Sequence, residues 1–216
     1  MELVQNFHNS MAGFADQHLK DLEQIVGSEP LEGNCFYKHR TLNINTDFYN
    51  KRVNLFWCGT QIDTKVCEIG FNAGHSAMLF LMGCTSPNVD FTVFDIGTHI
   101  YVDKAFEYSK KKFPDVHFEY VKGNSIQTIP EWIQNNTDKV NTYDVVHVDG
   151  GHTEECIVND MKNADILVKK GGIIVIDDSS HIPIQNCIDR YLQLPRYEEV
   201  RVLKTFGNPH RIIRKV

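Results

Sequence analysis

The sequence predicts an α/β fold in which a doubly wound, mostly parallel sheet carries helices on both faces. From residue 64 onward, runs rich in β-branched residues alternate with helical patterns. A glycine-bearing turn, GFNAG at 70–74, follows the first of these runs. The last two runs are separated only by a short turn, so the final strand should lie antiparallel to its neighbour. This alternation is typical of βαβ units with right-handed crossovers.

The N-terminal part is less regular than the rest. Residues 1–27 have apolar side chains at helical spacing and end at a glycine, which predicts an amphipathic helical segment. Residues 28–45 mix Pro, Gly, basic and aromatic residues and are interpreted as a loop or lid. A helix is expected over 47–58, ended by Gly59. We expect residues 1–60 to form a helical cap packed on a core made by residues 61–216.

The core contains seven strand-like runs with helical patterns between them. The expected strands are 65–70, 91–96, 117–123, 143–149, 172–178, 198–205 and 210–216, and the expected helices are 75–82, 102–112, 130–136 and 153–170. The last helix has a plausible N-cap at Thr153 and acidic residues in its first turn. Lys169 and Lys170 would complement its negative C-terminal end.

Composition excludes several classes of protein. The 216-residue chain has a formal net charge of −6, which argues against a general nucleic-acid binder because such proteins are usually basic. Six cysteines without a CxxC pair indicate reduced thiols rather than a disulfide framework or a zinc site. No apolar run approaches the roughly 20 residues that a membrane span needs. We therefore expect a cytoplasmic protein without nucleic-acid or membrane partners, and compatible with a homo-oligomer.

The turn after the first strand resembles a dinucleotide-binding fingerprint but does not match it. A G-x-G-x-x-G turn lets a pyrophosphate approach the backbone, whereas this chain has Asn72 and His75 at the second and third glycine positions. Asp95 ends the second strand-like run, where a carboxylate can accept hydrogen bonds from two ribose hydroxyls. The pattern favours a ligand with a ribose but without a pyrophosphate in this turn.

The stretch EIGFNAGHS at 68–76 resembles motif I of class I S-adenosylmethionine-dependent methyltransferases, in the variant found in small-molecule O-methyltransferases. The resemblance extends over about residues 64–216 and implies a Rossmann-like seven-stranded sheet of order 3-2-1-4-5-7-6 with the last strand antiparallel. It also implies the cofactor contacts: Glu68, Gly70, Asn72 and Ser76 for the methionine end, Asp95 for the ribose, and Asn124 and Ser125 for adenine.

Three carboxylates follow two strands of the expected sheet. Asp149 ends the fourth strand and Asp177 and Asp178 end the fifth, 28 positions later for Asp177, which is the length of one βαβ unit. Neighbouring strands lie about 4.8 Å apart, so the three acids should converge at the carboxyl edge of the sheet. A divalent cation such as Mg²⁺, Mn²⁺ or Ca²⁺ would relieve their repulsion. Alternatively, these acids cap a loop and a turn.

VDGGH together with VIDD is similar to metal-dependent O-methyltransferases of the catechol type and, through its Asp pair, to those that act on macrolide deoxysugars. That resemblance implies S-adenosylmethionine and Mg²⁺ or Mn²⁺ as cofactors. It also implies a small-molecule or glycan acceptor, in which one hydroxyl of a sugar-like vicinal diol is methylated. His152 stands where the catechol type carries a lysine base, which would make it the general base. Asp149 or a metal-bound water could serve instead. His181 would contact the substrate.

Other functions are compatible with parts of the pattern. A catechol-type small-molecule O-methyltransferase would use the same acids. An NAD(P)-dependent oxidoreductase is weakened by the missing glycines, and a non-catalytic cofactor-binding module would keep the fold without turnover. The acidic balance disfavours an RNA methyltransferase. Acceptor specificity is expected to depend on residues 28–60 and on the stretch after His181, the least patterned parts of the chain.

Overall fold

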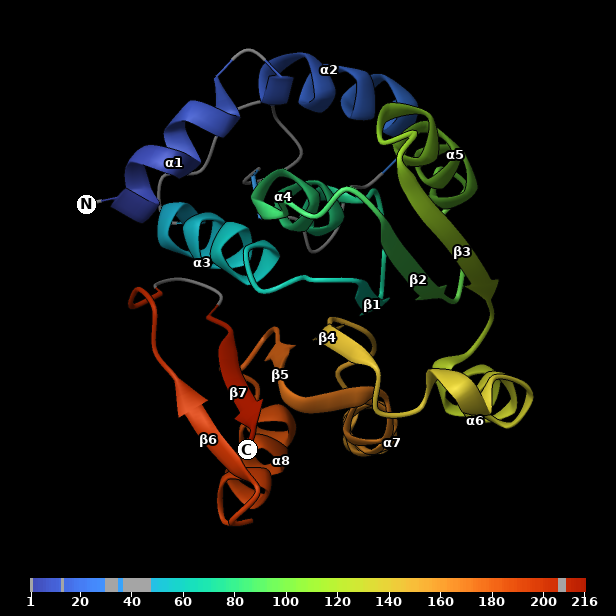
Figure 1. Cartoon of the computed structure of the whole chain (residues 1–216). Coiled ribbons are helices and arrows are strands. Elements are labelled where there is room, and N and C mark those ends of the chain that lie inside the picture. The colour runs from blue at the N-terminus through green and yellow to red at the C-terminus, as the bar shows by residue number, and fades with distance from the viewer. Residues whose placement is uncertain (1, 13, 30–34, 37–47, 206–208) are drawn as a thin grey trace.

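A seven-stranded sheet runs through the middle of the molecule in the order β3-β2-β1-β4-β5-β7-β6 (Figure 1). The computed structural model describes residues 2–12, 14–29, 35–36, 48–205 and 209–216. The strands are β1 Lys65–Ile69, β2 Val89–Asp95, β3 Val116–Lys122, β4 Tyr143–Val148, β5 Val168–Ile176, β6 Tyr197–Val200 and β7 Arg211–Lys215. β1 to β5 are parallel, and β7 is antiparallel to both β5 and β6. The predicted strand order and the antiparallel last strand are confirmed.

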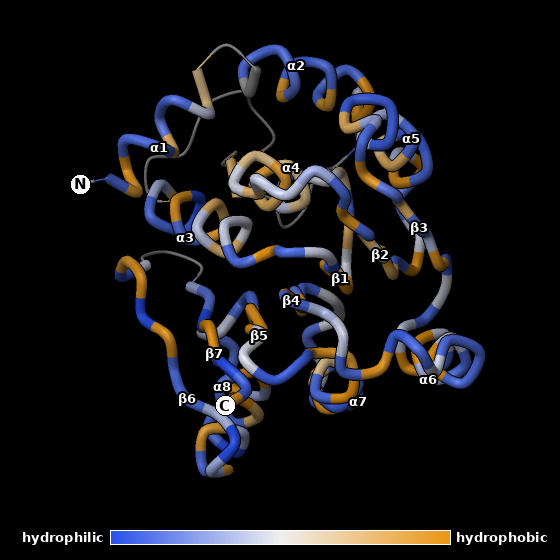
Figure 2. Tube along the Cα trace, in the orientation of Figure 1, coloured by the Kyte–Doolittle hydropathy of each residue, from blue (hydrophilic) through white to orange (hydrophobic). Residues whose placement is uncertain are grey.

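Helices cover both faces of the sheet, as predicted. One face carries α3 Tyr49–Gly59, α4 His75–Gly83 and α5 Val102–Lys112, with α1 Glu2–Met11 and α2 Phe14–Val26 outside them (Figure 1). The other carries α6 Ser125–Asn135, α7 Glu154–Leu167 and α8 Ile182–Leu192, and a short 3-10 helix spans Thr137–Lys139. Alternate residues of β4 enter two separate cores: Val145 belongs to the first and Val146 to the second. The outward turns of α2, α5 and α6 are hydrophilic (Figure 2).

The N-terminal segment forms two helices where the sequence predicted one. α1 ends at Met11 and α2 begins at Phe14. The sequence has a glycine at position 13, which lies outside the described residues, and a glycine in a helix interior costs about 1 kcal/mol relative to alanine. α3 begins at Tyr49, two residues later than predicted. Most of the predicted loop at 28–45 also lies outside the described residues.

Several boundaries differ from the sequence prediction for local reasons. α6 begins at Ser125 rather than at 130 because the Asn124 side chain accepts a hydrogen bond from Ile126 N (3.1 Å) and caps the helix. α7 ends at Leu167, and Lys169, predicted in its last turn, lies in β5 and forms an ion pair with Asp144. The β-branched run that begins at Val168 extends the sheet instead.

α8 was not predicted, although its buried residues Ile184, Cys187 and Ile188 have helical spacing. β6 is shorter than the predicted 198–205 and ends at Val200. Of the predicted turn at 207–209, only residue 209 lies within the described residues. Among the helices of the described ranges, none has both the length and the apolar character needed to cross a bilayer.

α3 joins the N-terminal part to the core through a very close contact with α4. A Cβ atom added to Gly59 would lie 2.1 Å from the carbonyl oxygen of Phe80, and one added to Gly83 would lie 2.0 Å from that of Phe56. The two helices therefore meet backbone to backbone, which only glycine allows at these positions. This contact fixes one end of α3 on the core.

Candidate active site at the carboxyl edge of the sheet

The turn between β1 and α4 needs unusual backbone conformations. Gly70 and Gly74 have φ of 90° and 78°, and Asn72 has φ of 52°. A Cβ on Gly70 would lie 2.0 Å from the carbonyl oxygen of Asp149, so the turn touches the end of β4 directly. Asparagine tolerates the left-handed region better than most residues. Asn72 thus adopts a conformation usually left to glycine, and its side-chain oxygen accepts a hydrogen bond from the Tyr101 hydroxyl (2.9 Å).

Asp95, predicted to bind a ribose, shapes the same turn. Its Oδ2 accepts hydrogen bonds from the backbone N–H groups of Phe71 and Asn72, both at 2.8 Å, and its Oδ1 accepts one from Gly97 N at 2.7 Å. A carboxylate has about four lone-pair positions, so capacity for a ligand hydroxyl remains. Asp95 therefore holds the turn in place and can also face a ligand.

Glu68 lies fully buried beneath the turn. Its Oε1 accepts a hydrogen bond from the Ser76 hydroxyl (2.5 Å) and contacts His147 Nδ1 (2.9 Å). Its Oε2 has no hydrogen-bond partner among the described residues. A buried carboxylate oxygen without a partner is costly, which marks this atom as a candidate partner for a cationic group of a ligand.

The ends of β4 and β5 bring acids together, as predicted. One ligand atom each from His147, Asp149 and Asp177 lies within 4.8 Å of the other two. Asp178, the third predicted metal ligand, is outside that group in the described structure. Its backbone has φ of 52° and its Oδ2 pairs with His152 Nε2 at 2.5 Å. Two of the three predicted acids therefore meet at one point, together with a histidine.

The acids differ in their electrostatic surroundings. Burial raises the pKa of Asp149 well above its ordinary value, and the nearby carboxylates of Asp177 and Asp178 add to the effect. Burial would also raise the pKa of Asp177, but Lys51, with Nζ 2.6 Å from Asp177 Oδ2, holds that pKa below its ordinary value. Asp177 is therefore an ionised acid with a cationic partner in direct contact, whereas the attraction of Lys51 for Asp149 does not outweigh burial and the neighbouring carboxylates.

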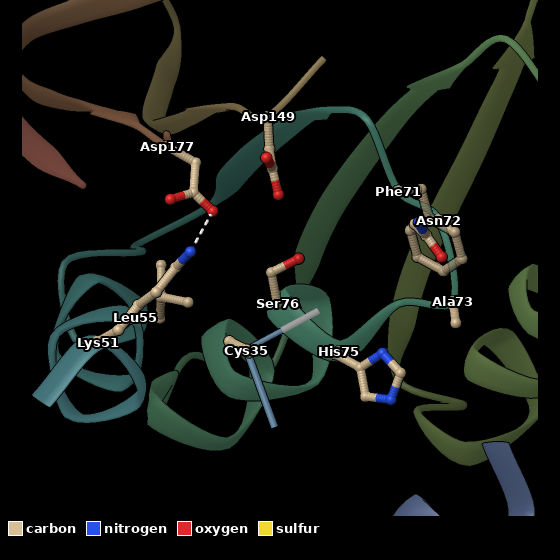
Figure 3. A pocket seen from close by; sticks show the side chains of 10 residues that line it. All are labelled: Cys35, Lys51, Leu55, Phe71, Asn72, Ala73, His75, Ser76, Asp149 and Asp177. Atoms are coloured by element: carbon tan, nitrogen blue, oxygen red, sulfur yellow. Dashed lines mark ion pairs between the residues drawn. The ribbon is translucent and has the colours of Figure 1, made fainter. Parts of the chain in front are cut away.

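The turn and the acids open into one pocket (Figure 3). In that view, Asp149 and Asp177 point into the same space as Ser76, and Lys51 reaches Asp177 from α3. The lining residues come from the N-terminal part, the turn, α4 and the two strand ends: Cys35, Lys51, Leu55, Phe71, Asn72, Ala73, His75, Ser76, Asp149 and Asp177.

Two other groups of predicted residues are not among the residues that line this pocket. Asn124 caps α6 and Ser125 is the first residue of that helix. His152 and His181 contact each other edge to face, with ring centroids 4.9 Å apart, beside Asp178. The His152 side chain is about half exposed. The predicted base and the predicted substrate contact therefore form one pair of rings.

Sequence reasoning missed Lys51 and His147. His147 carried a signal, because a histidine inside an apolar strand and two residues before Asp149 must lie on the same face of the sheet as that acid. Lys51 carried little signal. Nearly every residue of α3 from 51 to 59 is buried, so its polar residues could not be assigned to a solvent face or to the core.

Known proteins resemble this chain in sequence family and fold. A family model described as a methyltransferase domain matches residues 67–179. An O-methyltransferase from Bacillus cereus, solved with SAH, is 15% identical, with a TM-score of 0.67 over 93% of this chain and 90% of that one.

Two further solved structures have similar folds. TomG from Streptomyces achromogenes, an O-methyltransferase of tomaymycin synthesis solved with SAM, is 12% identical with a TM-score of 0.65, over 92% and 89% of the two chains. CalS11, a TDP-rhamnose 3'-O-methyltransferase of calicheamicin biosynthesis, is 14% identical with a TM-score of 0.61, over 94% and 95%. No curated protein matches the chain significantly by sequence.

Proposed function

The chain belongs to the methyltransferase-domain family whose model spans residues 67–179, and on that basis we propose that it is an S-adenosylmethionine-dependent O-methyltransferase. The observation that carries the proposal is the shared pocket, in which the glycine-bearing turn and the acids of β4 and β5 face the same space. Methyl transfer to a hydroxyl needs this proximity, because acceptor oxygen, methyl carbon and sulfur must be aligned.

The turn suits the methionine half of the cofactor. The methionine end would lie on Gly70 and Asn72, close to Glu68 and Ser76, with the unpartnered Glu68 Oε2 available to the cationic amino group. Asp95 would accept from the ribose, and Asn124 and Ser125 would flank adenine, in keeping with the resemblance to motif I.

The acids fit a divalent metal ion. We assign Mg²⁺ or Mn²⁺ to Asp149 and Asp177, since hard cations prefer carboxylate oxygens. Asp178, predicted as the third ligand, pairs with His152 and would have to leave that ring to join them. The raised pKa of Asp149 supports this fit, because added positive charge would stabilise its ionised form. When bound, such an ion lowers the pKa of a coordinated hydroxyl and fixes its orientation.

His152 is the proposed general base. Asp178 Oδ2 lies 2.5 Å from His152 Nε2, so this carboxylate orients the ring. It would also stabilise the imidazolium that forms when His152 takes the hydroxyl proton. Asp149 would orient the acceptor. His181, in ring contact with His152, would touch the acceptor at the edge of the pocket.

The proposed acceptor is one hydroxyl of a sugar-like vicinal diol. The pair Asp177-Asp178 supports this class, and CalS11 acts on a TDP-rhamnose. A labelled-methyl transfer assay against nucleotide sugars, free sugars and catechols, with and without Mg²⁺ or Mn²⁺, tests the proposal. We expect transfer to a sugar that depends on the added metal. Transfer only to catechols would show that the acceptor is a catechol rather than a sugar. Full activity in EDTA would show that no metal ion is needed. Failure to bind S-adenosylmethionine would contradict the proposed methyltransferase activity itself.

A further inference from the structure

The ammonium group of Lys51 lies at the same acids to which we assign a divalent metal ion. Its side chain is only 4% exposed, and its Nζ lies 2.6 Å from Asp177 Oδ2. The other oxygen of Asp177 accepts a hydrogen bond from Asp178 N at 2.8 Å. Both oxygens of Asp177 are thus already engaged within the protein.

A divalent ion on Asp177 would be close to the Lys51 ammonium. The ligand atoms of His147, Asp149 and Asp177 lie within 4.8 Å of one another, and Lys51 is in direct contact with one of them. Like charges at such distances repel strongly where burial weakens solvent screening. Lys51 and the ion therefore compete for the same carboxylate.

Without either cation the cluster would be unfavourable. Asp177 is 4% exposed, and a buried carboxylate without a partner is strongly destabilising. Lys51 supplies that partner from α3, in the N-terminal part of the chain rather than in the sheet that carries the acids. The ion pair between Lys51 and Asp177 therefore connects α3 to the end of β5.

We propose that Lys51 is a built-in counter-cation, which holds Asp177 while no divalent ion is bound and gives up this carboxylate when an ion binds. The inference rests on the metal site of the proposed function. It makes Lys51 the residue that sets the affinity for the ion, and it couples ion binding to the position of α3.

The test compares the full-length wild type with Lys51→Met and, as a matched control that keeps the charge, Lys51→Arg. After treatment with EDTA and its removal, each protein is titrated with Mn²⁺ at the same pH, about 8. The electron paramagnetic resonance signal of free Mn²⁺ gives the affinity. We expect Lys51→Met to bind Mn²⁺ more tightly by about tenfold or more, the scale of couplings between two ligands, and Lys51→Arg to resemble the wild type.

The outcomes separate this inference from the proposed function. Equal or weaker Mn²⁺ affinity in Lys51→Met overturns the inference and leaves the metal site in place. Absence of Mn²⁺ binding in the wild type and in Lys51→Met, with S-adenosylmethionine binding retained in calorimetry, overturns the inference and the metal site but not cofactor binding. If Lys51→Met fails to fold, Lys51→Gln replaces it.

A second measurement uses the wild-type protein, so that a folding defect of a Lys51 variant cannot affect its result. In protein with ¹³C-labelled lysine, the Cε resonance of Lys51, identified by its loss in Lys51→Arg, should shift when Mg²⁺ is added. An unchanged Lys51 resonance at a Mg²⁺ concentration that saturates the site would show that Lys51 keeps its contact with Asp177, which overturns the inference.

Discussion

Replacing Gly70 by alanine tests the contact between the cofactor turn and the end of β4. The new Cβ would lie 2.0 Å from the carbonyl oxygen of Asp149 and 2.6 Å from its carbonyl carbon, where only backbone can yield. The φ of 90° adds a conformational penalty of roughly 1–2 kcal/mol. Overpacking against backbone adds roughly 1–3 kcal/mol. We therefore expect a loss of about 2–5 kcal/mol in the free energy of unfolding.

The assay is urea denaturation, with Gly171→Ala as the matched control. Gly171 also has a positive φ, 83°, but a Cβ there would meet no atom of the described residues within 4 Å. That variant isolates the backbone penalty, and the difference between the two variants measures the clash. Calorimetry should also show weakened S-adenosylmethionine binding for Gly70→Ala alone. Equal stability losses in the two variants would refute the close-approach argument.

Three further outcomes are expected. Asp177→Asn should abolish methyl transfer and Mn²⁺ binding while calorimetry still detects S-adenosylmethionine binding; loss of all three would mean that the acids and the cofactor turn are not separable. Glu68→Gln should weaken cofactor binding by about tenfold or more, because a hydrogen bond to a charged group is worth about 1.5–3 kcal/mol, and an unchanged Kd would exclude contact with the amino group. The free energy of unfolding, measured by urea denaturation, should fall as the pH drops from about 6.5 to about 5, by up to about 1.4 kcal/mol per pH unit for each buried neutral histidine, since the unfolded chain takes up these protons first. Burial lowers the pKa of these histidines to about 4 for His18, about 3 for His75 and about 4 for His210. Two acids offset part of this loss, because burial raises the pKa of Asp160 to about 6 and that of Asp149 well above its ordinary value. Three histidines against two acids leave a net loss, and a free energy of unfolding that stays constant or rises on acidification would contradict the assignment.

The sheet could be predicted because its signals are local. Each parallel strand is a β-branched run followed by a helical pattern, and the acids Asp149 and Asp177 follow directly from the ends of two such runs. The resemblance to motif I, rather than this local signal, implied Glu68 and Ser76 at the methionine end of the cofactor, and the structure joins the two by a hydrogen bond. Strand ends in a parallel sheet share one edge, so sequence position predicts which residues lie at that edge, though not which way each side chain turns.

The features that the sequence did not predict depend on contacts between distant parts of the chain. Lys51 reaches Asp177 only because α3 packs on α4, and no pattern around residue 51 encodes that packing. Asp178 turns toward His152 because its backbone takes a positive φ, which the preceding strand pattern does not reveal. Lys169 pairs with Asp144 in the sheet instead of ending a helix, since a strand pairing outweighed the local helix signal.

The backbone contact between Gly59 and Gly83 gives α3 a fulcrum. That contact lies at the C-terminal end of α3, whereas Lys51 lies near its beginning. Eight residues separate Lys51 from Gly59, a lever arm of about 12 Å at 1.5 Å per residue. A tilt of about 10° around the fulcrum would carry the Lys51 backbone by about 2 Å, a displacement close to the 2.6 Å length of its ion pair with Asp177. A small rotation of α3 would therefore change the distance between Lys51 and Asp177 while the glycine contact with α4 is kept.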